Sequence, residues 1–358
     1  MSILVILVVF LLLILIYGWV LQRYVIRRIS VKRQFKDAYV YCGDTSEMIE
    51  TIINPTPFLI PWLRIESRIS PYLQFGNAEN LAIQGDMYHL SLFTVKGYQQ
   101  IVRHHKVHFL RRGVYNVGSA ALTLGDITGL FTVTCDQKTD MHVTVYPHIT
   151  DTRDLPSPLN HLSGVWSKER RILHDPFMIR NIRDYMYGDP YKDIHWAASA
   201  RTQQLQVKIH EDEAMIKLMV IINAQTREDQ WDDLMDYEQT AIENHISLAA
   251  AICLEALRNG MQAGFATNMP LLGANKESST YFYPQMRPGW DEMLLAYLAQ
   301  LQVHRTLRFP SFLDTIQFAE DTAYLVISCY DSPSLQTQLE EIRSQGYQIS
   351  LHVSQGAM

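Results

Sequence analysis

The sequence is poor in cysteine and contains no close pair of cysteines. Only four occur in 358 residues, and no C-x-x-C pair is present. Structural zinc sites and dithiol redox sites need such pairs, so the sequence supports neither. We expect each cysteine to be reduced and to pack as a small apolar residue of a cytosolic fold. The four are Cys42, Cys135, Cys253 and Cys329.

An excess of positive charge is also missing. The 31 Lys and Arg residues are outnumbered by 37 Asp and Glu residues, which gives a formal net charge of −6. Nucleic-acid-binding domains carry a basic footprint, so we expect no nucleic-acid partner. The phosphate loop G-x-x-x-x-G-K-[ST] and the nucleophile elbow G-x-S-x-G are absent from the sequence. The length and the 47% hydrophobic content allow two domains with full cores.

One long apolar run stands at the start of the chain. The first 22 residues carry no charged side chain, and Ile3 to Leu21 is nearly all Ile, Leu, Val and Phe. Nineteen helical residues extend about 28 Å, close to the thickness of the hydrocarbon core of a bilayer. A signal peptide would show a basic start, a shorter apolar run and a small-residue cleavage site, and none of these is present.

The residues after this run predict its orientation. Trp19 and Tyr24 suit a membrane interface, and a basic flank marks the cytoplasmic side. We therefore expect a transmembrane anchor over residues 1–22 that contacts lipid through Ile3–Leu21, and a basic juxtamembrane linker over 23–29. The bulk of a single-pass protein of the cell membrane would then be cytoplasmic. The basic residues are Arg23, Arg27, Arg28, Lys32, Arg33 and Lys36.

Residues 30–150 alternate polar and apolar side chains in short runs that are divided by turn residues such as Asn54-Pro55 and Gly76-Asn77. Many short strands without crossover helices predict antiparallel sheets, most simply a β-sandwich-like domain. Residues 151–175 contain Pro156 and Pro158 and lack a periodic apolar face, so they are interpreted as a linker.

Residues 176–356 alternate strands and helices. The strands LQVKIH and IKLMVIIN precede a helix from Tyr237 to Arg258, which Asn259-Gly260 ends. A later helix starts at the cap Ser332 and stops at Gly346. The alternation predicts a parallel, doubly wound α/β sheet. The fold class is thus an N-terminal membrane helix, an all-β domain and an α/β domain.

A conspicuous polar segment lies in the α/β half. Asp189-Pro190 is a helix-start signal, which predicts a short helix from Pro190 to about Arg201 with Asp189 as its cap. Trp196 would anchor this helix to the sheet.

Charged residues of both signs surround the predicted helix. A carboxylate at Asp189 and guanidinium groups at Arg183 and Arg201 would form a charge-assisted latch. The sequence leaves open whether Asp189 pairs with Arg183, Arg201 or Lys192.

This segment carries a resemblance to a known family. It resembles the signature R-x-Y-x-x-G-D-x-x-[RK]-x-I-x-W-x-x-[ST]-A-R of the domain of unknown function 58 family. The segment from Leu110 to Phe131 is similar to that family's R-R-G-x-Y and D-P-F-G-L-F motifs, with Ile127-Thr128 in place of Pro-Phe. The signature residues are Arg183, Tyr185, Gly188, Asp189, Lys192, Ile194, Trp196, Ser199, Ala200 and Arg201.

The resemblance implies more than a fold. Members of that family usually carry two N-terminal membrane helices, whereas this sequence shows one. The resemblance implies that the α/β domain is von Willebrand factor A-like and that a MoxR-type AAA ATPase is a partner.

A von Willebrand A domain binds a divalent ion through D-x-S-x-S at the end of its first strand, where oxygen ligands suit Mg²⁺. Here Asn223, Gln225 and Arg227 occupy those positions, which predicts a poor metal site. The loop Glu228–Glu238 is rich in acids and follows a strand's carboxyl end, where α/β sheets bind ligands. We expect these acids to complement the next helix's N-terminus, and a cation-binding role stays open.

Histidines offer two further candidates. His104 and His108 would share one strand face but lie about 13 Å apart, too far for one zinc ion. We expect them, with His105, to be surface polar residues. His195 precedes Ser199 by four residues, but a general base needs a positioned nucleophile and an orienting acid, so we expect no catalysis there.

The sequence therefore favours a membrane-anchored, cytoplasmic interaction or assembly protein that works with a MoxR-type AAA ATPase. We expect neither enzymatic activity nor a cofactor, and the signature residues would be structural or partner-binding. A metal-dependent binding module or a hydrolase of unknown substrate is the alternative.

Overall fold

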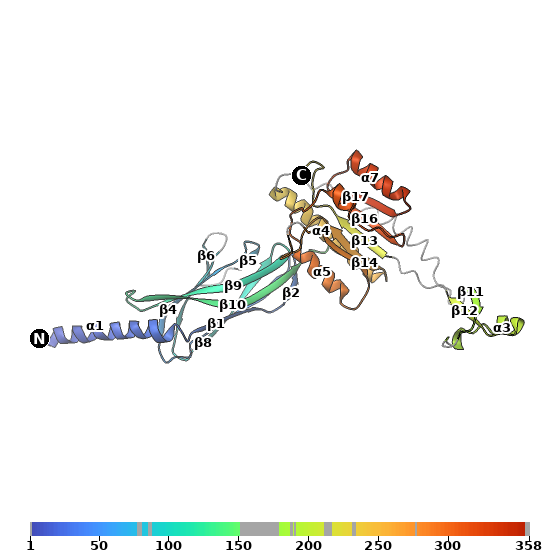
Figure 1. The fold of residues 1–358 in the computed structure, drawn as a ribbon. Helices are drawn as coiled ribbons and strands as arrows, with labels where there is room; N and C mark the ends of the chain where they lie inside the picture. Colours follow the sequence, from blue (N-terminus) through green and yellow to red (C-terminus); the bar gives the residue numbers. More distant parts are fainter. Residues whose placement is uncertain are drawn as a thin grey trace. The chain divides into compact units, whose positions relative to one another are not determined.

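The chain folds as two compact units (Figure 1). The structure is a computed structural model, which describes residues 2–76, 81–84, 88–150, 179–186, 189, 191–210, 217–230, 234–275 and 278–354. The first unit is Met1–Ile149 together with Glu292–Gln302, and the second is Thr150–Asp291 together with Val303–Met358. The predicted linker 151–175 lies outside the described residues.

The first unit begins with the apolar helix α1 (Ser2–Val20), which continues as the π-helix η1 (Leu21–Val25). The stretch Ile3–Val25 is long and apolar enough to cross a membrane. The segment 23–29 differs from the prediction of a separate linker, because Val25, Ile26 and Ile29 are buried together with Leu21. Leu21, Val25 and Ile29 recur every four residues, the spacing of an apolar helical face. The helix therefore ends inside the core of the domain that follows.

Two mostly antiparallel sheets form the rest of this unit, as the alternating pattern predicts. The four-stranded sheet runs β1 (Ser30–Phe35), β3 (Thr45–Ile53), β8 (Gln100–Phe109), β5 (Leu73–Phe75). The six-stranded sheet runs β2 (Tyr39–Tyr41), β10 (Thr132–Tyr146), β9 (Gly113–Gly125), β4 (Ile60–Arg68), β7 (Tyr88–Val95), β6 (Leu81–Gln84). One pair, β2 with β10, is parallel.

The two sheets share their cores. Val31 and Ile52 of the four-stranded sheet are buried in one cluster with Leu63 and Leu122 of the six-stranded sheet and with the end of the apolar helix. Every second residue of β3 is buried, so one face of each sheet turns inward.

An ionic cluster is buried inside this unit. Arg33 Nε donates to Glu50 Oε1 at 2.8 Å, and the Nε2 atom of His105 lies 3.4 Å from Glu50 Oε2. Arg33 also donates to the Ser67 hydroxyl. His105 is therefore a core residue and not a surface residue, because a carboxylate on the neighbouring strand compensates its burial.

The second unit is built on a five-stranded sheet in the order β15 (Thr280–Gln285), β14 (Gln262–Thr267), β13 (Lys217–Ile222), β16 (Thr322–Ser328), β17 (Gln348–Val353). The strands β14, β13, β16 and β17 are parallel, and β15 is an antiparallel edge strand that the sequence did not predict. The chain winds outward in both directions from β13, which is buried along nearly its whole length. This half is therefore α/β with its topological switch point between β13 and β16.

Helices connect these strands. They are α4 (Asp236–Arg258), α5 (Trp290–Gln300), α6 (Phe309–Leu313) and α7 (Pro333–Ser344). Two of the predicted limits are confirmed: α4 ends before Gly260, whose φ is +79°, and Ser332 caps α7 by accepting the Leu335 N–H at 3.2 Å.

The signature segment forms a small sheet of its own. The strands β11 (Ile179–Asp184) and β12 (Gln206–His210) pair antiparallel, with the 3-10 turn η5 (Tyr191–Asp193) and the helix α3 (Trp196–Thr202) between them. The strand LQVKIH, predicted as part of the large sheet, is therefore half of this hairpin. We refer to residues 179–210 as the signature module.

Candidate functional site

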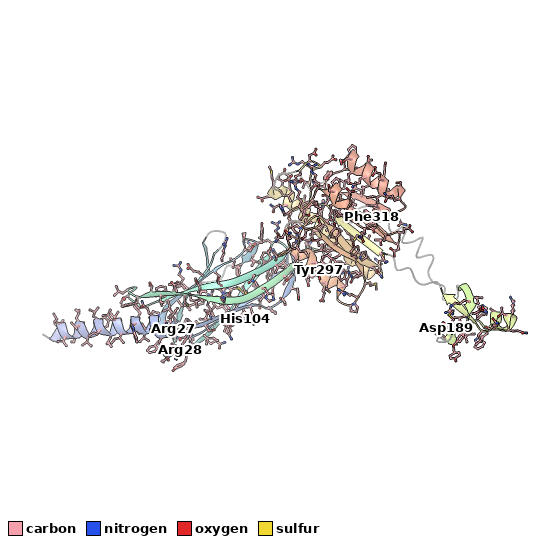
Figure 2. All side chains as sticks on the ribbon, in the orientation of Figure 1. Arg27, Arg28, His104, Asp189, Tyr297 and Phe318 are labelled. Atoms are coloured by element: carbon pink, nitrogen blue, oxygen red, sulfur yellow. The ribbon has the colours of Figure 1, made fainter. Side chains whose placement is uncertain are left out.

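The signature module is organised by a clasp between an arginine and an aspartate. Arg183 Nη1 and Nη2 lie 2.7 Å and 2.7 Å from the two carboxylate oxygens of Asp189. Asp189 Oδ2 also accepts the Met186 N–H at 2.8 Å, which closes the turn after β11. The hydrogen bond from Arg183 and that of the Met186 amide lower the pKa of Asp189 to about 2. Asp189 thus pairs with Arg183 among the three partners that the sequence allowed; Figure 2 labels its position.

The predicted helix from Pro190 to Arg201 is wrong in its first half. Ile194 is buried and forms a β-bridge with Val207, which interrupts the helical path. The helix α3 starts only at Trp196, and its N-cap is His195, whose Nδ1 accepts the Ala198 N–H at 3.0 Å. The N-cap of α3 is therefore His195 and not Asp189.

Ser199 joins the helix to the hairpin. Its hydroxyl donates to the His195 carbonyl at 3.0 Å and accepts the Gln206 N–H at 2.9 Å. The Gln206 amide in turn donates to Asp184. The Ser199 hydroxyl is thus bonded to main chain rather than to the His195 ring, so the pair is not arranged as nucleophile and general base.

Three of the predicted signature residues are exposed to solvent. Lys192 and Arg201 are exposed, and Trp196 is 67% exposed instead of being anchored to the sheet. Trp196 is the first residue of α3, whereas Ser199, which bonds to β12, occupies the covered side. Tyr185 stacks on Tyr191 with ring centroids 6.2 Å apart. Gly188 and Pro190 lie outside the described residues.

A second candidate site is the carboxyl end of the parallel strands. Asn223 is fully buried, donates from Nδ2 to the Ser328 hydroxyl at 3.1 Å and accepts the Gln225 N–H at 2.9 Å. Asn268 accepts the Ala224 N–H at 2.9 Å, and Gln225 Oε1 accepts a backbone N–H of α6 at 2.6 Å. Neutral amides, bonded to main-chain groups and to the Ser328 hydroxyl, thus lie at the carboxyl end of the parallel strands, where α/β sheets have their crevice.

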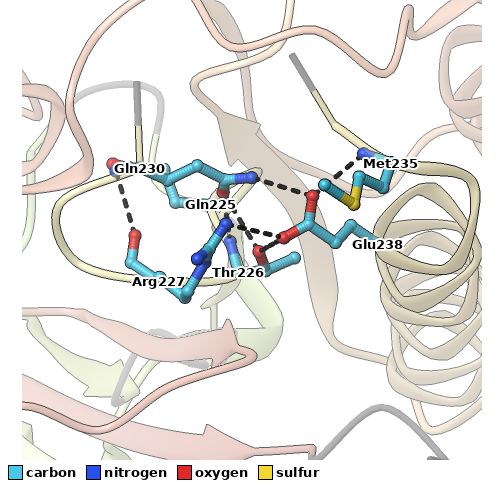
Figure 3. A network of polar contacts seen from close by, with 6 residues as sticks. All are labelled: Gln225, Thr226, Arg227, Gln230, Met235 and Glu238. Carbon is cyan, nitrogen blue, oxygen red and sulfur yellow. Dashed lines mark hydrogen bonds and ion pairs between the residues drawn. The ribbon is translucent and has the colours of Figure 1, made fainter. Parts of the chain in front are cut away.

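The acidic loop beside this crevice is built around Glu238 (Figure 3). Its carboxylate accepts the Met235 N–H at 2.9 Å, the Thr226 hydroxyl at 2.8 Å and the Gln230 amide at 3.2 Å, with Arg227 Nη2 at 3.4 Å. Burial raises the pKa of Glu238, but these hydrogen bonds and the Arg227 charge outweigh it, so the pKa is lowered overall. Glu238 thus secures the N-terminus of α4.

The remaining acids of this loop are less engaged. Glu228 accepts a hydrogen bond from Ser334, and Asp229 and Asp236 are exposed. Asp232 and Asp233 lie outside the described residues, as do Glu211, Asp212 and Glu213, which follow β12. Over the part of the chain that the structure describes, no group of three or more His, Cys, Asp or Glu residues is arranged to hold a metal ion.

Two residues of the motifs between Leu110 and Phe131 have structural roles that the sequence did not reveal. Arg112 is buried, and its Nη1 donates to the carbonyls of Leu298, Ala299 and Leu301 at 2.8, 3.2 and 2.8 Å. These acceptors, at the C-terminus of α5, lie in the part of the first unit contributed by Glu292–Gln302. An arginine suits the orphan carbonyls of a helix end, but the long sequence separation hides this pairing.

The second such residue is Asp126, which holds the turn between β9 and β10. Its Oδ1 accepts the Phe131 N–H at 3.0 Å, and its Oδ2 accepts the Thr128 N–H at 3.3 Å. Thr128 and Gly129 after this Asp are typical of a turn, but the sequence alone did not identify the N–H groups that the Asp126 carboxylate accepts.

Comparison with known proteins bears on the signature segment. Residues 181–284 match the family described as "Protein of unknown function DUF58". The chain is 22% identical over 252 residues to the uncharacterized protein YeaD of Bacillus subtilis (strain 168). That alignment covers 70% of this chain and 59% of the relative, so the chain spans less than two thirds of that protein.

Solved structures resemble only part of the chain. A CARDB domain from Pyrococcus furiosus is 12% identical and covers 33% of this chain and 93% of its own, with a TM-score of 0.23. A non-cellulosomal cohesin from Archaeoglobus fulgidus is 10% identical and covers 35% and 94%, with a TM-score of 0.24. Scores this low carry no argument.

The family match spans the Arg183–Asp189 clasp, the amide-filled crevice and the Glu238 network, which are the features described above. The expected resemblance is thus confirmed over residues 181–284, which match the DUF58 family of proteins of unknown function.

Proposed function

We propose that this protein is a membrane-anchored, cytoplasmic interaction or assembly protein that presents its signature module to a protein partner. The observation that carries the proposal is the exposure of Trp196, with Met186 and Tyr191 also exposed on the same small module. Solvent-exposed tryptophan and tyrosine side chains are typical of interaction hot spots. The Arg183–Asp189 clasp and the Ser199 bonds hold the frame that displays them.

The way the apolar helix ends supports a permanent anchor. Leu21 and Val25 belong to the same buried cluster as Leu63 and Leu122 of the sandwich. Removal of the helix as a signal sequence would take these side chains out of the core and leave a cavity. The exposed basic residues Arg23, Arg27 and Arg28 lie at the C-terminal end of the span and just beyond it, and they support a cytoplasmic location for the rest of the chain.

The partner that we propose is a MoxR-type AAA ATPase, which the family resemblance suggests. In this proposal the α/β unit is von Willebrand factor A-like, and its doubly wound strand order with one antiparallel edge strand supports that assignment. The crevice where such a domain would hold a metal is occupied by neutral amides, which favours a protein-binding role over a metal-dependent one.

Capture of the ATPase by the full-length chain, solubilised from membranes in detergent, tests the proposal. Trp196→Ala is expected to reduce capture at least about tenfold, the effect of losing a hot-spot side chain, while the melting temperature is unchanged. Tyr237→Ala is the matched control, because Tyr237 is an equally exposed aromatic residue on α4. Equal capture by wild type and the Trp196 variant would contradict the proposal. A Mg²⁺-dependent rise in melting temperature that Asp229→Ala abolishes would favour the alternative of a metal-dependent module.

A further inference from the structure

Two loops of the sandwich contact the C-terminal turns of the apolar helix, and a third loop is held against one of them. The Tyr17 hydroxyl donates to the Leu59 carbonyl in the loop before β4. A Cβ atom at Gly18 would overlap the ring of Phe131, so the turn between β9 and β10 lies directly against the helix. The end of the β9–β10 hairpin accordingly lies beside α1 in Figure 1.

The third loop is the turn between β7 and β8. The Tyr98 N–H donates to the Thr56 carbonyl at 2.9 Å, and the Asn54 amide donates to the Lys96 carbonyl at 2.9 Å. This turn is thereby held against the loop that carries Leu59. All three loops belong to the first unit and gather at the end of the sandwich where the helix enters.

Each of these loops exposes large apolar side chains. Ile127 is 79% exposed, Tyr98 is 73% exposed and Leu130 is 68% exposed, and Leu59 is exposed beside them. Single exposed apolar residues are common on soluble proteins, but a group on adjoining loops is typical of an interaction surface. We call Leu59, Tyr98, Ile127 and Leu130 the apolar rim.

The charge around the apolar rim is positive. Arg23, Arg27, Arg28 and Lys96 are exposed, and Figure 2 labels Arg27 and Arg28 at the end of the helix. The one carboxylate of the turn from Asp126 to Phe131 is Asp126 itself, which is 1% exposed and bonded within the turn. The surface therefore offers apolar side chains next to cations, the combination that suits an anionic membrane surface.

The position of the apolar rim along the helix axis indicates its depth in the bilayer. Tyr17 and Gly18 lie five or six residues before Arg23, the first charged side chain of the chain. At the standard helical rise, they lie about 8 Å further along the axis towards the apolar side. An arginine that ends a membrane span extends to the headgroups, so the loops that contact Tyr17 and Gly18 are at the boundary of the hydrocarbon region.

We propose that the apolar rim is a second membrane contact, which inserts into the headgroup–acyl boundary of the leaflet that the helix end crosses. This inference rests on the proposed membrane anchor and adds a surface to it. The ligand is the anionic lipid bilayer, with the apolar side chains in the upper acyl region and the four cations at the phosphates. The contact fixes the orientation of the sandwich on the membrane, because three loops and one helix together define a plane.

Fluorescence in vesicles tests the apolar rim. The full-length chain, with its four native cysteines replaced by Ser or Ala, carries an NBD label at Ile127→Cys or at the control position Leu110→Cys. Leu110 is exposed and follows β8 at the opposite end from Tyr98. In vesicles of phosphatidylcholine and phosphatidylglycerol, we expect a blue-shifted label at 127 that brominated lipids quench several-fold more than the label at 110. Equal quenching at both positions overturns the proposal.

Photocrosslinking uses the unmodified chain, so it tests the apolar rim also when the cysteine-free variant does not fold. A phosphatidylcholine with a diazirine in its upper acyl chain should label peptides that cover 126–131 and 96–99 as well as the apolar helix. Labelling of the helix alone would contradict the proposal that the apolar rim contacts the membrane. Carbonate extraction of the same membranes separates the two proposals: release of the chain refutes the anchor, whereas retention without rim labelling refutes only the second contact.

Discussion

Two arginine–carboxylate pairs in this protein have nearly the same separation and opposite surroundings. Arg33 and Glu50 meet at 2.6 Å in the sandwich core, where their side chains are 1% and 0% exposed. Arg183 and Asp189 meet at 2.7 Å in the signature module, where the exposures are 40% and 16%. Distance therefore says little about what a pair contributes, since desolvation and screening differ between the two places.

The difference assigns different tasks to the two pairs. The buried pair must stay intact, because Arg33 without Glu50 would be an uncompensated charge in an apolar core. The exposed pair adds little to global stability, and its value is local: it closes the turn at Met186 and fixes the frame around Trp196. Substitutions at these and related residues test whether stability depends on burial in this way.

Removal of the buried carboxylate should have the largest effect. Glu50→Ala is expected to lower the free energy of unfolding by about 3–5 kcal/mol, because Arg33 would remain buried without its partner. Urea unfolding in detergent measures it. The triple variant Arg33→Met/Glu50→Leu/His105→Leu should recover most of the loss, since it removes both charges and the imidazole that contacts Glu50. A triple variant as unstable as the single one would contradict this explanation.

Glu238 tests an intermediate case, because the carboxylate is 3% exposed while its partner Arg227 is 65% exposed. Glu238→Gln is expected to cost about 1–3 kcal/mol through weakened bonds to Met235, Thr226 and Gln230. Asp229→Asn, an exposed neighbour, is the control and should be neutral.

The same residue predicts a pH dependence. The folded-state pKa of Glu238 is lowered from 4.5, so its stabilisation is fully present above about pH 4.5 and is lost as the pH falls through the folded pKa. Unfolding free energies measured from pH 6 downwards should therefore fall less steeply for Glu238→Gln than for wild type. Parallel slopes would contradict the assignment.

The exposed clasp should act locally. Asp189→Asn is expected to speed amide exchange at Met186 while the global melting temperature changes little. Because the pKa of Asp189 is lowered from 3.8 to about 2, the clasp is complete above about pH 4 and opens as the pH falls through 2. Hydrogen exchange of the signature module measures this, with Lys192→Ala as control. A large drop in global stability would show that the clasp is not local.

The smallest effect is expected at Arg201. It is exposed in the last turn of α3, so Arg201→Ala should change the free energy of unfolding by less than about 0.5 kcal/mol. Thermal melts against wild type measure it. A clear destabilisation would indicate a role in the clasp that the geometry does not provide.

Much of the fold is predictable from local patterns. The helix α4 follows from its apolar periodicity, and α7 follows from Ser332 at its cap and Gly346 beyond its end. The strand β13 is recognisable because a continuous apolar run suits a strand covered on both faces. These signals succeed because the residues that fix each element are its own neighbours in sequence.

The contacts of the candidate site were less predictable, because the residues that pair there are distant in sequence or override a local signal. Asp189-Pro190 is a good local helix start, but the pairing of Ile194 with Val207 displaces the cap to His195. His105 is buried because Glu50, 55 positions away in sequence, stands beside it. Tertiary contacts overrode local propensity in both cases.

The shared cluster of the apolar helix and the sandwich has a consequence for biosynthesis. In a membrane-anchored chain, the helix leaves the ribosome before the strand β9, whose Leu122 and Leu124 pack in the same cluster as Leu21 and Val25. If the proposed anchor holds, the helix enters the lipid while the sandwich still lacks β9, and the core closes against a segment that the bilayer already holds. In that case the sandwich would complete its folding at the membrane surface, after the molecule has reached its destination.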